Sequence, residues 1–196
     1  MSDLLSRFGK PAALLAAVVG VAGDAYHFTL DDRSEVAMSF GYRAHGIALM
    51  IAFFLAILAL LRLALLHGGR WGAVGRVGVL LALAGTITTI ADIWAETIVL
   101  PGVTAGAPTL LDEDASGFHL AAVAFVFLGL FGLGWLLVAV ASFRAGLASR
   151  ASSAFLGIAA VLAALPIGGS YVLLLLGIAW ISLTADASAE PRGSPA

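Results

Sequence analysis

Six long apolar segments constrain this chain more than any other feature of its sequence, because short stretches of charge, proline and glycine separate them. A helix needs about 20 apolar residues to cross the hydrocarbon core of a bilayer. Of the 196 residues, 61% are hydrophobic and 11% charged, against roughly half and a quarter in a soluble domain. A soluble fold of this size would leave too much apolar surface in water. The sequence therefore predicts an all-α polytopic membrane protein with six transmembrane helices in a bundle.

The predicted spans cover residues 11–30, 44–66, 73–100, 118–141, 151–167 and 170–184. The last two are short, and a turn signal at Pro166, Gly168 and Gly169 separates them. They form either two thin full spans or a re-entrant hairpin, and the apolar runs on both sides favour full spans. We expect residues 1–185 to form one transmembrane domain. Residues 186–196, rich in Ser, Ala and Pro, are predicted to be a disordered cytoplasmic tail.

The basic residues predict the orientation, because cytoplasmic loops carry an excess of Lys and Arg. Eight of the ten fall on one side of the six spans, and only Arg33 and Arg43 fall on the other, beside the acidic loop residues. We expect both termini to be cytoplasmic and the acidic loops to face outward. Nine arginines against one lysine, with abundant alanine, indicate a GC-rich bacterial genome and hence a bacterial plasma membrane, the cell inner membrane.

The first span also has features of a signal peptide. Arg7 and Lys10 precede an apolar run, and Val21, Ala22 and Gly23 could form a small-residue cleavage site. Because the same run continues to Leu30, we expect this segment to be retained as a transmembrane helix.

One constant displacement along the chain, which we call the repeat displacement, relates several polar residues. It carries His45 onto His119, and it carries Arg70, which follows His45, onto Arg144, which follows His119. Arg76 and Arg150 are related in the same way. The pattern suggests that spans 1 and 2 and spans 3 and 4 form parallel hairpin repeats, related by an axis along the membrane normal.

Ionisable residues within the apolar runs are the candidate site, because a charge at the bilayer centre costs about 2.5–3.5 kcal/mol. Asp24 and His27 are three residues apart, and Asp92 and Glu96 are four apart. Each pair therefore lies on one face of its helix. The apolar run continues beyond Asp92 and Glu96, which favours a buried, partnered role for both. If the first four helices form a bundle, six residues meet at one depth in a polar pocket open to the outside: Asp24, His27, His45, Asp92, Glu96 and His119.

Three chemistries suit these six residues. They could bind a divalent metal ion through oxygen and nitrogen ligands. His45 and His119 could be the axial ligands of haem b, or carboxylates and imidazoles could relay protons or cations. The absence of cysteine excludes thiolate ligands and thiol nucleophiles.

No motif decides between these functions. An HExxH signature, a Gly-rich phosphate loop and a GxSxG elbow are all absent, so the catalytic residues are unknown and the sequence does not settle whether the protein is an enzyme. The leading hypothesis is a metal- or haem-binding pocket. The alternatives are a small proton- or cation-coupled transporter, a non-catalytic subunit of a membrane complex, and an enzyme that uses Asp92 or Glu96 as a general acid on a lipid-like substrate.

Other readings of the polar and aromatic residues are purely structural. The ionisable set could serve only internal hydrogen bonding, and Tyr42 and Tyr171 are expected to be interface anchors or packing residues. The expected partners are the lipid bilayer and either a second copy of the chain or a membrane-complex subunit. A net charge of -2 gives no basic footprint for nucleic acid.

Three short motifs carry a resemblance. They are Gly134-Trp135-Leu136-Leu137, Phe143-Arg144-Ala145-Gly146 and Leu165-Pro166. This stretch, about a third of the chain, resembles small uncharacterised multi-pass membrane proteins of high-GC, actinobacterial-type bacteria. The resemblance implies a membrane location and carries no activity.

Overall fold

The computed structural model describes residues 2–27, 40–67, 69–106, 120–165 and 169–187. Within these ranges the chain is helical, without strands, and helices lie at all six predicted positions, which confirms the all-α class. The elements are α1 (Ser2–His27), α3 (Phe40–His67), α4 (Gly72–Trp94), the π-helix η1 (Ala95–Val99), α5 (Leu100–Gly106), α6 (Leu120–Ala145), α7 (Arg150–Ala163) and α8 (Ser170–Ala187). α8 ends two residues beyond the predicted domain boundary, and residues 188–196 lie outside the described residues.

Three of the described helices are long and apolar enough to cross a membrane. They are Phe40–His67, Gly72–Val99 and Leu128–Ala145. α7 is shorter, and α1 carries Arg7, Lys10 and Asp24 along its length. Length and composition are thus compatible with a membrane protein, while the six-span bundle and its orientation stay predictions.

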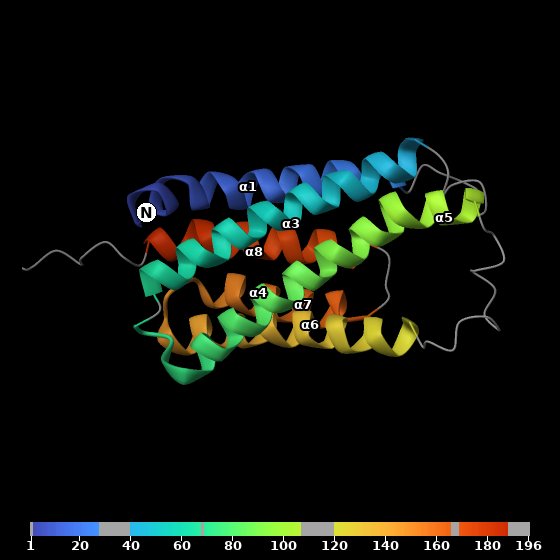
Figure 1. Cartoon of the computed structure of the whole chain (residues 1–196). Coiled ribbons are helices and arrows are strands. Elements are labelled where there is room, and N and C mark those ends of the chain that lie inside the picture. The colour runs from blue at the N-terminus through green and yellow to red at the C-terminus, as the bar shows by residue number, and fades with distance from the viewer. Residues whose placement is uncertain (1, 28–39, 68, 107–119, 166–168, 188–196) are drawn as a thin grey trace, which may run out of the picture.

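Two helix pairs dominate the packing, α1 against α3 and α4 against α6. α7 and α8 pack on each other and join the two pairs, because α7 contacts α6 and α8 contacts α1. We call the end where α3 and α6 finish the basic end, since Arg70, Arg76, Arg144 and Arg150 lie there, and the opposite end the polar end. Figure 1 shows α7 and α8 stopping well short of the polar end, which α1, α3, α5 and α6 approach.

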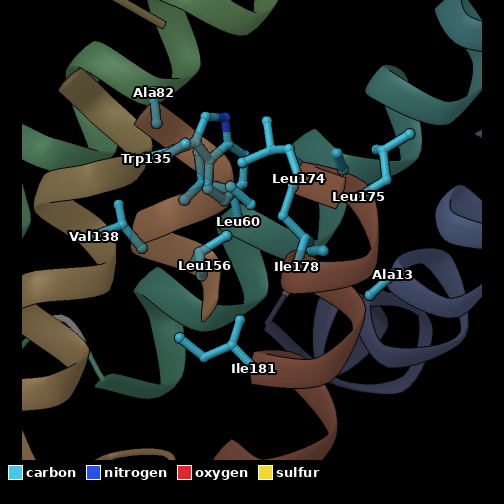
Figure 2. Close-up of a cluster of buried hydrophobic side chains, with 14 of the residues drawn as sticks. Ala13, Leu60, Ala82, Trp135, Val138, Leu156, Leu174, Leu175, Ile178 and Ile181 are labelled. Atoms are coloured by element: carbon cyan, nitrogen blue, oxygen red, sulfur yellow. The ribbon is translucent and has the colours of Figure 1, made fainter. Parts of the chain in front are cut away.

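The core lies where the two helix pairs meet α8. Trp135, Leu60 and Leu174 come from three different helices and are fully buried beside one another (Figure 2). Phe53, Phe131 and Tyr171 form a second cluster, in which every pair of rings packs edge to face at centroid distances of 5.3–6.0 Å. Such aromatic pairs stabilise a fold by more than the burial of their apolar area alone. These rings therefore hold α3, α6 and α8 together.

Small residues bring the paired helices close together, as is usual between membrane helices. On α3, Ala52, Ala56 and Ala59 are fully buried, and their three- and four-residue spacing puts them on one helix face. In the other pair, a Cβ built on Gly85 would lie 2.6 Å from the backbone nitrogen of Phe131. The contact between α4 and α6 is therefore made backbone to backbone.

A left-handed glycine follows Arg70 and its repeat counterpart Arg144. Gly72 and Gly146 have φ angles of 63° and 61°, a region that glycine adopts without steric cost. Each comes two positions after Arg70 or Arg144, so the two glycines are also related by the repeat displacement. The sequence correspondence thus extends to the backbone at the basic end, while the parallel relation of the two hairpins stays a prediction.

Candidate functional site

An acid and a histidine meet between α1 and α3 at the polar end. Asp24 is buried, with 8% of its surface exposed, and its Oδ1 lies 4.0 Å from Nε2 of His45. Gly23 lets the helices approach here, because a Cβ on it would lie 2.9 Å from Cβ of Ala48. The structure therefore brings together Asp24 and His45, two of the six predicted residues, on facing helices.

The hydrogen bonds of His45 fix its tautomer. Nδ1 lies 3.0 Å from the carbonyl oxygen of Gly23, and a carbonyl can only accept, so Nδ1 carries the hydrogen and donates. In the neutral ring Nε2 is then the atom without hydrogen, and it faces Asp24. Oδ2 of Asp24 has no hydrogen-bond partner among the described residues. This geometry places the ring nitrogen that can take up a proton opposite a carboxylate that would balance the charge.

Asp92 and Glu96 form an acidic pair at the same end, but their surroundings differ from the prediction. Both are exposed on the surface of the chain, not buried. Ile93 and Thr97 take the buried positions of this turn, and η1 packs against α3, α4 and α5. The apolar run beyond Glu96 correctly indicates a helix, but the expectation of burial is wrong.

Two tyrosines from neighbouring helices lie within electrostatic reach of this pair. The charges of Asp92 and Glu96 act on the hydroxyl groups of Tyr42 on α3 and Tyr171 on α8. From the sequence alone, both tyrosines are expected to be interface anchors or packing residues. The signal that could have found Tyr42 is its helical spacing of three residues from His45.

The Asp24–His45 pair and the Asp92–Glu96 pair lie close to one another along the bundle, because α3 and η1 are in contact beside them. A Cβ built on Gly46 would overlap the side chain of Thr97, and these residues are the chain neighbours of His45 and Glu96. π-helical segments are rare and are frequent at functional sites. Pro101 accounts for this one, since it has no N–H to donate and its ring disfavours a regular turn over the preceding four residues.

The remaining predicted ligands are not placed. His119 lies outside the described residues, and His27 ends α1 without a described side chain. Among the described residues no group of three or more histidine, aspartate or glutamate side chains could hold a metal ion. The six-residue metal set and the haem ligands His45 and His119 stay predictions.

Comparisons with protein-family models, curated proteins and solved structures found no match to this chain. The functional assignment therefore rests on the geometry of its own residues.

Proposed function

We propose that this protein is a small proton- or cation-coupled membrane transporter in which Asp24 and His45 bind the coupling ion. The observation that carries the proposal is the pair itself, a buried aspartate beside a half-buried histidine: Nε2 of His45 faces the Asp24 carboxylate, and the Gly23 carbonyl holds Nδ1. A proton on Nε2 forms an ion pair with Asp24, and its release leaves a neutral ring. The Asp24–His45 pair can thus exist in two charge states without a change in the structure of the site.

The depth of the pair supports a role in transfer across a membrane. The stretch of α3 from His45 to His67 is about 33 Å long at a rise of about 1.5 Å per residue, close to the thickness of the hydrocarbon core. The pair therefore lies near one membrane boundary. Ionisable residues within membrane-spanning segments are typical of ion pathways.

Asp92 and Glu96 supply a route toward the pair in this proposal. Both are exposed at the polar end, and η1 contacts α3 at Gly46, next to His45. Carboxylates on the surface can take up protons or cations from water. Tyr42 and Tyr171 extend this polar region toward the core, since Tyr171 packs against Phe53 and Phe131.

Proton flux in liposomes tests the proposal. The full-length protein is reconstituted, a pH gradient is imposed, and the internal pH is followed with a dye. We expect flux with the wild-type protein, and flux at the level of protein-free liposomes with Asp24→Asn or His45→Gln. Thr88→Val is the matched control, because the Thr88 hydroxyl bonds only to the carbonyls of Ala84 and Gly85 on its own helix, one turn from Asp92. Unchanged flux in both site variants would overturn the proposal.

A bound divalent metal ion is the second candidate. Two observations favour it: Nδ1–H of His45 is fixed by a carbonyl, the usual support of a metal-binding imidazole, and Oδ2 of Asp24 has no partner among the described residues. Elemental analysis of freshly purified protein tests it. A stoichiometric metal that Asp24→Asn removes would favour this candidate, and a metal-free wild-type protein that supports proton flux would exclude it.

A further inference from the structure

A second polar feature lies at the basic end, far from the Asp24–His45 pair. A cavity of about 300 Å³ opens between the start of α4 and the end of α6. Its size falls at the lower end of ligand pockets, which span roughly 300–1,000 Å³. Arg70 and Arg144 both line it, and no acidic residue does. The two arginines of the sequence repeat thus meet in one cavity.

The backbone at the start of α4 adds hydrogen-bond donors. Gly72, Ala73 and Val74 line the cavity and form the first turn of α4, where backbone N–H groups have no partner within the helix. The positive φ of Gly72 directs the chain into this turn. Trp71, at the N-cap position, makes no side-chain capping bond. The positive end of the α4 dipole therefore faces the same space as the two guanidinium groups.

Trp71 adds an indole ring to the wall of the cavity. It lines the cavity and is 5% exposed, yet its Nε1 has no hydrogen-bond partner among the described residues. A buried indole N–H usually finds an acceptor.

On the opposite wall of the cavity, Arg70 offsets the partial negative charge at the end of α6. α6 ends at the cavity, and the end of a helix carries partial negative charge. Arg70 donates from Nη2 to the carbonyl oxygen of Ala145 at 3.2 Å, while the nitrogen of Gly146 bonds to Phe143. The terminal carbonyl is thereby capped, and the guanidinium of Arg70 is held at the rim with other N–H groups still available.

We propose that this cavity binds the phosphate group of an anionic ligand, with Arg70, Arg144 and the first turn of α4 as donors. Guanidinium groups pair with phosphate through short charge-assisted hydrogen bonds. The ligand is either an anionic lipid headgroup or a soluble phosphate, since both present the same oxygens.

Binding to the full-length protein in detergent micelles tests this proposal. Native mass spectrometry counts bound phosphatidylglycerol, with phosphatidylcholine of the same chain length as the comparison and inorganic phosphate as a competitor. We expect Arg144→Gln to weaken binding about tenfold, the size of one charge-assisted contact, and the double change Arg70→Gln with Arg144→Gln to abolish it. Arg144→Gln does not remove the bond between Arg70 and Ala145, so we expect the variant to fold.

The matched control removes the same charge elsewhere at this end. Arg76 and Arg150 are exposed, are related by the repeat displacement, and do not line the cavity. The double change Arg76→Gln with Arg150→Gln should therefore leave binding unchanged. Displacement by inorganic phosphate would identify the ligand as a soluble phosphate, and resistance to it would identify a lipid. Equal losses of binding in the two double variants would overturn the proposal. So would a wild-type protein that prefers neither phosphatidylglycerol nor inorganic phosphate over phosphatidylcholine.

Discussion

The α1–α3 and α4–α6 pairs both bring two helices together through small residues, but they place their polar groups differently. In α4–α6 the polar contact lies in the middle of the interface and is satisfied: Trp135 donates from Nε1 to Thr86 Oγ1 at 3.2 Å, and Thr86 donates to the Ala82 carbonyl. In α1–α3 it lies at the polar end and is incompletely satisfied, since Oδ2 of Asp24 has no partner among the described residues. A satisfied network stabilises a fold, whereas an incompletely satisfied ionisable pair can still bind an ion.

The largest effect is expected from a substitution that breaks the backbone contact between α4 and α6. A Cβ on Gly134 would lie 2.5 Å from Cα of Ala82, so Gly134→Ala must push the helices apart. We expect the free energy of unfolding to fall by about 2 kcal/mol, the overpacking cost less the gain in helix propensity. The measurement is unfolding in mixed detergent micelles. Gly129→Ala on the same helix is the control, because its Cβ meets no atom within 4 Å. Equal stability of the two variants would show that α4 and α6 do not pack this closely.

A smaller effect is expected from removing the central hydrogen bond. Thr86→Val leaves the buried Trp135 Nε1 without its acceptor, which should cost about 1 kcal/mol. Thr88→Val provides the comparison, because its hydroxyl bonds only to its own helix. The same assay in a Trp135→Phe background isolates the coupling. Additive losses would mean that the bond between Thr86 and Trp135 contributes nothing.

The smallest effect on stability is expected in α1–α3. Asp24→Asn leaves no unpaired buried charge, because His45 can release its proton, so we expect a loss below about 0.5 kcal/mol, within the range of ordinary substitutions. The same variant should abolish proton flux. A large loss of stability would instead assign the pair a structural role and remove the contrast between the two interfaces.

The positions of the helices could be predicted from the sequence because apolar runs of about 20 residues have few other solutions. The continuation of the third helix beyond residue 100 could not, since Pro101 and Gly102 normally end a helix. In the structure the π-helix η1 precedes the proline, and α5, which contains Pro101, runs on to Gly106.

The candidate site was predicted in part. The spacing of polar residues placed Asp24 and His45 at one level, and the structure pairs them. The periodicity of one helix does not reveal which neighbouring helices extend as far as Asp92 and Glu96. The sequence therefore could not predict that both side chains are exposed. The repeat displacement identified Arg70 and Arg144, but that both line one cavity depends on how α4 packs against α6.

The protonation of His45 tests the central claim most directly. Nitrogen NMR of the protein with labelled histidine rings reports which ring nitrogen carries hydrogen, and His45→Gln identifies the signal among the four histidines. We expect the neutral ring to carry its hydrogen on Nδ1, and acidification to add a proton at Nε2 while Nδ1–H remains. A neutral ring with its hydrogen on Nε2, or a ring that stays neutral under conditions where the liposomes show flux, would contradict a proton-binding Asp24–His45 pair.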